Sequence, residues 1–246
     1  MLQIENLYLF LFILPIISFL YASVGHGGAS GYLALMALFS FVPETMKPTA
    51  LLLNLFVAGI SFYYYFKEGF FNKKLFLFFC VTSIPLAFLC GTIEIGAPLY
   101  KKTLAVLLVF AILKMLNVFG KESENINQVK LWHGLLAGGI IGFFSGLIGI
   151  GGGIILTPLI LLLHWGNMKE AAAVSALFIW VNSAAGLVGQ LSSGVTLQTD
   201  MFVLVAIALI GGVLGGYLGS KKLNNRSLRY LLALVLAIAC SKLFFT

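Results

Sequence analysis

Two long stretches of this chain, residues 6–43 and 131–168, contain no aspartate, glutamate, lysine or arginine. Only 9% of the 246 residues are charged and 61% are hydrophobic, whereas a soluble domain carries about 25% charged residues. The polar coat of a soluble protein is missing, so most of the surface must face lipid. A lipid-embedded backbone must satisfy its own hydrogen bonds, as helices or closed barrels do. The apolar runs are continuous and lack the alternation of barrel strands, which predicts an all-α membrane protein.

The charge and motif content exclude several other classes of function. The net charge of +7 comes from basic residues in short loops between apolar runs, which is typical of membrane proteins and does not indicate nucleic-acid binding. The three cysteines are isolated in apolar segments without metal-ligand spacing. The sequence has no zinc-protease, nucleophile-elbow or ATP-binding-loop motif. We therefore expect no metal, no cofactor and no enzymatic activity.

The two uncharged stretches begin 125 residues apart, close to half the chain, and each has a glycine cluster near its middle. Further glycines match at the same offset, including Gly69 with Gly194 and Gly91 with Gly216. Such a fixed offset is typical of an internal repeat. We predict a first transmembrane repeat, a cytoplasmic linker and a second transmembrane repeat, at residues 1–118, 119–130 and 131–246.

Each predicted repeat contains five apolar segments. The segments that directly follow the glycine clusters have about 15 residues, whereas a spanning helix needs about 20. They can be tilted spans, half-helices or arms of re-entrant hairpins, so seven to ten spans are compatible with the sequence. The predicted segments are 6–23, 28–43, 48–66, 75–93 and 103–119 in the first repeat, and 131–148, 152–166, 171–191, 201–220 and 229–245 in the second.

The lysines and arginines indicate how the repeats are oriented. If the loop with Lys221, Lys222 and Arg226 is cytoplasmic, alternation of the segments places 11 of the 15 basic residues on that side. The loop before Asp200, which has no basic residue, then lies outside. The first repeat starts outside and the second starts inside, which predicts the inverted-topology repeats typical of secondary transporters.

The glycine clusters, residues 25–28 and 149–153, are the sharpest candidates for a binding site. Several glycines within five residues should break a helix, which leaves free N–H groups and the positive end of a helix dipole where the chain becomes helical again. Such helix ends bind anions without a buried lysine or arginine. The alternative is that the glycines only let helices pack closely, and this interpretation suits Gly211, Gly212, Gly215, Gly216 and Gly219, at helical spacing.

Polar residues near the clusters extend the candidate site. His26 could donate to an anion or pass a proton, or it could be a neutral histidine bonded to a nearby carbonyl. The other polar side chains are candidate ligand donors, although hydrogen bonds between helices explain them equally well. The candidate substrate-binding residues are Gly25, His26, Gly27, Gly28, Ser30, Thr49, Asn54, Gly149, Gly151, Gly152, Gly153, Ser175 and Asn182.

The paired motifs resemble those of a known family. Val24-Gly-His-Gly-Gly-Ala-Ser-Gly31 and Leu147-Ile-Gly-Ile-Gly-Gly-Gly-Ile-Ile155 are similar to the paired G-x-G-G-G segments of the sulfite exporter TauE/SafE family, also described as toluene-sulfonate uptake permeases. The resemblance implies an inner-membrane protein that moves sulfite, sulfonates or other small sulfur-containing or organic anions. It assigns the motif glycines to the site. This sequence departs from the family pattern at two positions, Ala29, which stands in place of a third glycine, and His26.

These observations together predict a multi-pass transporter in the inner (plasma) membrane that holds a small anion between opposed helix N-termini of the two repeats. A coupling proton or sodium ion and the lipid bilayer are the other expected partners, and nucleic acid is not. A passive anion channel is the alternative, and a membrane-embedded enzyme is a weaker one. The sequence leaves the substrate, the direction of transport and the oligomeric state open.

Overall fold

The computed structural model describes residues 4–116, 127, 129–221, 237 and 240. Within this part of the chain the secondary structure is α-helical and contains no strand, which confirms the predicted all-α class. Most of the predicted segment 229–245 and most of the predicted linker 119–130 lie outside the described residues. The helices are α1 (Ile4–Ala22), α2 (Ala29–Leu38), α3 (Pro43–Lys67), α4 (Lys73–Gly91), α5 (Ala97–Met115), α6 (Leu131–Ile148), α7 (Gly153–Leu162), α8 (Met168–Ser192) and α9 (Thr199–Lys221).

Five of these helices are long and apolar enough to cross a membrane: α3, α4, α6, α8 and α9. Large apolar side chains cover the outward faces of the bundle, among them Phe12, Val81 and Ile210, which are 69%, 63% and 62% exposed. A soluble protein would rarely expose so much apolar surface. The chain is therefore a multi-pass membrane protein.

The two helices that follow the glycine clusters are short. α2 and α7 have 10 residues each and end earlier than the predicted segments 28–43 and 152–166. Each ends in a left-handed turn, because Ser40 and His164 have φ of 61° and 54°. The first turn is closed by a hydrogen bond from Phe41 N to Met36 O. The second is closed by a hydrogen bond from Trp165 N to Ile160 O, and both of these residues lie 124 positions after their counterparts. A span of about 20 residues is thus excluded for both helices.

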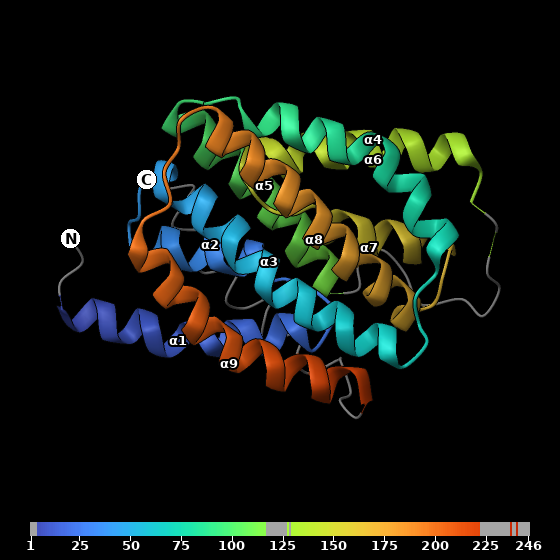
Figure 1. Cartoon of the computed structure of the whole chain (residues 1–246), viewed down its shortest axis with the longest axis horizontal. Coiled ribbons are helices and arrows are strands. Elements are labelled where there is room, and N and C mark those ends of the chain that lie inside the picture. The colour runs from blue at the N-terminus through green and yellow to red at the C-terminus, as the bar shows by residue number, and fades with distance from the viewer. Residues whose placement is uncertain (1–3, 117–126, 128, 222–236, 238–239, 241–246) are drawn as a thin grey trace.

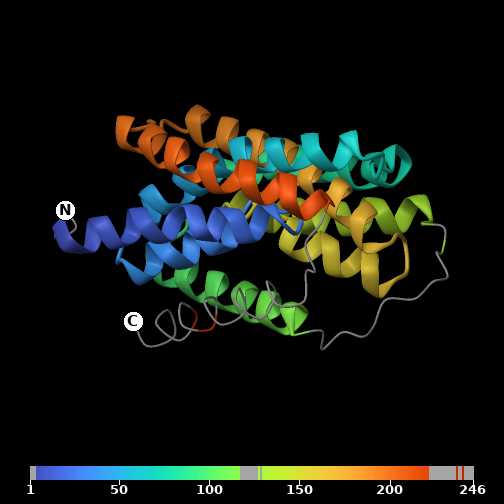
Figure 2. The same ribbon diagram turned by 90° about the horizontal axis from the view of Figure 1, so that it is seen from below.

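The longest helices, α3 and α8, have 25 residues each and pack against each other at the centre of the bundle. In Figure 1, α1 and α9 lie side by side along one edge, and α4 and α6 lie together along the opposite edge. Figure 2 shows α5 on the lower face of the molecule in that view. The centre of the molecule is therefore formed by the middles of α3 and α8 with the broken segments beside them.

Close helix packing explains the glycines of α9, as predicted. A Cβ added at Gly211, Gly215 or Gly219 would overlap the backbone of α1 at Pro15, Phe19 or Ser23. Gly212 and Gly216 face α3 instead, against Val57 and Tyr64. A second series in α6, at Gly138, Gly142 and Gly146, meets the backbone of α4 in the same way. Small residues thus let both helix pairs approach at backbone distance.

The interhelical loops gather at two ends of the bundle. At one end, the start of α3, the α4–α5 loop and the α8–α9 loop line a common pocket. At the other end, Lys221 Nζ at the end of α9 lies 3.9 Å from Glu68 Oε1 in the α3–α4 loop. There the Lys169 ammonium donates to Ser220 O at 3.2 Å and lies over the Phe70 ring. Loops that alternate along the chain therefore alternate between the two ends, as spanning helices require.

Candidate functional site

The two glycine clusters break their helices, as predicted. In the first cluster Gly25 N donates to Ala22 O at 3.1 Å, and Gly28, with φ of 101°, is the residue before α2. In the second, Gly149 N donates to Ser145 O at 2.9 Å, and Gly152, with φ of 80°, is the residue before α7. Both segments thus turn through left-handed glycines directly into a new helix, and neither N-cap glycine offers a capping side chain of its own.

The two clusters meet at the same pair of side chains in the middle of α3 and α8. A Cβ added at Gly27 would lie 2.5 Å from Asn54 Oδ1 and 2.9 Å from Ile179 Cγ2. One added at Gly151 would lie 2.5 Å from Asn54 Nδ2 and 2.9 Å from the same Ile179 atom. The starts of α2 and α7 therefore converge on Asn54, which is fully buried.

Asn54 connects the first cluster to the opposite half of the bundle. Its Oδ1 accepts a 3.0 Å hydrogen bond from Ala29 N, the first amide of α2. Its Nδ2 donates to Ser183 Oγ on α8 at 3.1 Å. A carboxamide is suited to this position because it offers an acceptor to the helix N-terminus and a donor to the partner helix.

His26 extends from the first cluster toward α7 and α8. The ring is 6% exposed, with Nδ1 2.9 Å from Val24 O and Nε2 3.1 Å from Thr157 Oγ1. Thr157 in turn donates to Ser175 Oγ at 2.7 Å. A Cβ added at Gly153 would lie 3.7 Å from the histidine ring. This network ties the loop of the first cluster to the first turns of α7.

The remaining predicted polar residues are buried but have other partners. Ser30 Oγ shares a 2.7 Å hydrogen bond with the Tyr21 hydroxyl, and Thr49 Oγ1 donates back to Thr45 O at 2.6 Å. Asn182 Nδ2 donates to Phe178 O of its own helix. None of these bonds reaches a cluster glycine. Conversely, Thr157 and Ser183 belong to the site and were not predicted from the sequence.

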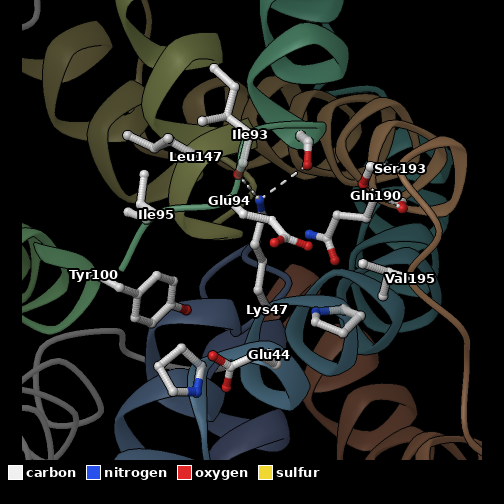
Figure 3. Close-up of a pocket in the computed structure, with 13 residues that line it drawn as sticks. Glu44, Lys47, Ile93, Glu94, Ile95, Tyr100, Leu147, Gln190, Ser193 and Val195 are labelled. Atoms are coloured by element: carbon white, nitrogen blue, oxygen red, sulfur yellow. Dashed lines mark hydrogen bonds between the residues drawn. The ribbon is translucent and has the colours of Figure 1, made fainter. Parts of the chain in front are cut away.

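A pocket of about 120 Å³ lies between the candidate site and one end of the bundle (Figure 3). Lys47 of α3 lies inside it and donates to Gly91 O at 3.2 Å and to Ile93 O at 3.4 Å. A Cβ added at Gly149 would lie 2.9 Å from Lys47 Cγ, so the pocket borders the second cluster. Glu44, Glu94 and Gln190 also line the pocket.

Comparison with known proteins assigns the chain to a family. The family model described as sulfite exporter TauE/SafE matches residues 9–243. The chain belongs to this family. The match covers both glycine clusters and all the helices that form the site, so the predicted resemblance is confirmed. No solved structure matches the chain.

Curated relatives are named as transporters. A probable membrane transporter protein of Sinorhizobium fredii, y4hK, is 35% identical over 233 residues, 93% of this chain and 94% of the relative. The probable membrane transporter protein MJ0441 of Methanocaldococcus jannaschii is 26% identical over the same shares of the two chains. YdhB of Bacillus subtilis, also a probable membrane transporter protein, is 27% identical over 82% of this chain and 84% of its own length. This chain is accordingly a probable membrane transporter of the TauE/SafE family.

Proposed function

We propose that the chain is a secondary transporter of small anions in the plasma membrane, with sulfite, sulfonates and other sulfur-containing or organic anions as its substrate class. The observation that carries the proposal is the convergence of the α2 and α7 N-termini on Asn54. The family name supplies the substrate class, because the matching model is that of a sulfite exporter.

The chemistry of the convergence favours an anion. The start of a helix presents free N–H groups and about half a positive charge from the helix dipole. Two such ends meet here in a buried place, where each hydrogen bond to a charge is stronger than in water. The Asn54 oxygen already occupies the first amide of α2 at 3.0 Å, as an anion oxygen would when it displaces the side chain.

His26 adds a donor to the same place. Val24 O can only accept, so His26 Nδ1 donates to it. Its Nε2 lies 3.1 Å from Thr157 Oγ1. A ring that donated from both nitrogens would carry a positive charge, which a bound anion would balance.

We further propose that the two halves are inverted repeats and that transport is a movement of one half against the other. The offsets of 124–125 residues between corresponding turns and site contacts support the repeat. The alternation of loops between two ends of the bundle supports the inversion, since α3 ends at one end and α8 at the other. Movement about a fixed central site would expose the anion to each side in turn.

Equivalent loop positions should therefore react from opposite sides of the membrane. Glu68 and Ser193 are exposed, lie 125 residues apart and follow α3 and α8 directly. In a variant whose native cysteines are replaced by alanine, Glu68→Cys should react with a membrane-impermeant maleimide only from the cytoplasm. Ser193→Cys should react only from outside. Labelling of both from one side would contradict the inverted arrangement. The native cysteines to be replaced are Cys80, Cys90 and Cys240.

The substrate class is tested with purified protein and a panel of sulfite, thiosulfate, sulfonates and carboxylates. At least one of these anions should raise the thermal unfolding midpoint and show saturable uptake with counterflow in proteoliposomes. An anion that binds only the native state raises the free energy of unfolding as RT ln(1 + [L]/Kd), so the midpoint should keep rising with the logarithm of the anion concentration, whereas the uptake rate should saturate. Non-saturable flux would favour a channel, and stabilisation by a neutral solute without any anion would contradict the helix-end site.

A further inference from the structure

The interface of α4, α6 and α8 contains buried polar atoms without a hydrogen-bond partner among the described residues. They are Ser83 Oγ on α4, Ser145 Oγ on α6, and Asn182 Oδ1 and both amide atoms of Gln190 on α8. The first three side chains are fully buried and Gln190 is 2% exposed. Nearly all buried polar groups in proteins are paired, and an exception indicates a water molecule, an ion or a functional role.

Contacts between the helices place Ser83 and Asn182 at one level. One turn before them the centroids of the Phe79 and Phe178 rings are 6.5 Å apart. One turn after them, a Cβ added at Gly186 would lie 3.7 Å from Ala87 O. Helices that run in the same direction keep this register, because residues four apart lie on one face. Ser83 and Asn182 therefore share the level between these two contacts.

Ser145 of α6 belongs to the same region. A Cβ added at Gly142 would lie 2.5 Å from Ser83 Cα, and Gly146, one turn later, has its Cα 3.8 Å from the Cβ position of Gly186. Ser145 lies between these two glycines on α6. Three closely packed helices thus bring three unpartnered oxygen atoms to adjacent levels.

Gln190 of α8 lies between this interface and the Lys47 pocket. Gln190 lies two turns beyond Asn182 on α8, about 12 Å along the helix, and Gly186 lies between them on the same face. Gln190 lines the pocket, and Figure 3 shows its amide directed toward Lys47 and Glu94. Unpartnered polar groups therefore extend from an open pocket to the level of Ser83.

The electrostatic field along this route favours a cation. The contacts above require α4, α6 and α8 to run in the same direction, so their C-terminal ends, at Gly91, Ile148 and Ser192, point toward the pocket. Helix C-termini carry partial negative charge. The ammonium group of Lys47 is already bound there by two carbonyl groups at the end of α4, and two glutamates line the same pocket.

The corresponding interface of α1, α3 and α9 differs. Its buried polar groups are paired: Ser18 Oγ donates to Ala208 O at 2.6 Å, Ser61 Oγ to Ala22 O at 2.9 Å and the Tyr65 hydroxyl to Ser23 O at 3.0 Å. The residue 125 positions before Asn182 is Val57. These serine and tyrosine groups are paired, whereas the corresponding serines of the α4–α6–α8 interface are not; the buried Tyr32 hydroxyl of α2 is the other oxygen without a partner among the described residues.

We propose that the α4–α6–α8 interface binds a sodium ion through Ser83 Oγ, Ser145 Oγ and Asn182 Oδ1, with the Lys47 pocket as its access route. Hard cations prefer oxygen ligands, and coupling ions of transporters bind to side-chain and carbonyl oxygens near the bilayer midplane. A proton is excluded as the ligand, because neither serine nor asparagine titrates in the physiological range. The inference rests on the proposed function and adds to it an ion that accompanies the anion.

The test compares thermal unfolding of the purified full chain in sodium gluconate and in choline gluconate at equal ionic strength. Sodium should raise the midpoint by about 3 °C when its concentration is well above the dissociation constant. Asn182→Val, which places the residue of the equivalent α3 position in α8, should abolish this difference. Ser83→Ala serves the same purpose if the first variant does not fold. The matched control is Ser18→Ala, which removes a buried serine of the other interface and should keep the sodium shift.

Equal midpoints in both salts for the wild type, or an undiminished sodium shift in Asn182→Val and Ser83→Ala, would overturn the proposal and leave water as the partner of these atoms. Sulfite binding measured in both salts separates this result from the proposed function. Equal midpoints together with sulfite binding in both salts refute the cation site and leave the anion site intact. A sodium shift without binding of any anion in the panel supports the cation site and refutes the proposed function.

Discussion

Replacing Gly151 by leucine should abolish saturable anion uptake while the protein remains in the membrane. Gly151 has φ of 69°, a conformation that costs other residues about 1–2 kcal/mol. Its Cβ would lie 2.5 Å from Asn54 Nδ2 and 2.9 Å from Ser183 Oγ, so the hydrogen bond between these side chains must break. The Asn54 oxygen then no longer holds the first amide of α2. The leucine side chain should also block at least one hydrogen bond between these helix ends and the anion, and such a loss costs about 1.5–3 kcal/mol, which lowers affinity by about tenfold or more.

Uptake of sulfite into proteoliposomes, normalised to the amount of inserted protein, measures this effect. The matched control is Gly139→Ala on α6, whose Cβ would lie 3.4 Å from Leu86 Cδ1 and 3.8 Å from Thr82 Cβ. These are ordinary contacts at a helical position, so uptake should be unchanged. Normal uptake by Gly151→Leu would mean that the clusters serve only to let helices pack, which was the alternative interpretation of the sequence.

The broad architecture could be predicted because two strong physical signals set it. Long stretches without charge can only be membrane helices, and several adjacent glycines break a helix, so α1, α2, α6 and α7 follow from composition and spacing. The ends of α2 and α7 could not be predicted. Ser40 and His164 adopt left-handed turns although neither is glycine, so no residue type marks these ends in the sequence. α3 likewise begins at Pro43, earlier than the predicted 48–66, since proline suits the first turn of a helix.

The candidate site could be predicted only where residue type itself limits the choice. Gly27 and Gly151 do meet at Asn54, but Asn182, the other predicted asparagine, bonds within its own helix. The residue that shares this place with Asn54 is Ile179, at an offset of 125, and the hydrogen-bond partner of Asn54 is Ser183. Polar residues one position apart on a helix differ in direction by about 100°, so a shift of a few residues changes which helix they face. Amino-acid type alone does not resolve such a shift.

Replacing Gly215 by alanine should lower the thermal unfolding midpoint by about 5 °C or more, although alanine is the better helix former. The added Cβ would overlap the Phe19 carbonyl oxygen of α1 and would lie 2.9 Å from both its carbonyl carbon and its Cα. These are backbone atoms in a helix, so they cannot move aside as a side chain does. α1 and α9 must therefore separate, and the packing on both sides of Gly215 is lost. Unfolding followed by intrinsic fluorescence in detergent measures the effect.

Gly212→Ala on the same helix is the matched control. Its Cβ would meet only side-chain atoms, at 3.2–3.3 Å from the Val57 methyl groups and 3.4 Å from Ser18 Oγ, and these can shift by a few tenths of an ångström. The gain in helix propensity, about 1 kcal/mol, should offset this adjustment and leave the midpoint close to that of the wild type. Equal midpoints for the two variants would show that α1 and α9 are not held at backbone distance. A selective loss in Gly215→Ala would establish that the α9 glycines have a packing role, which separates them from the cluster glycines, whose replacement should impair uptake.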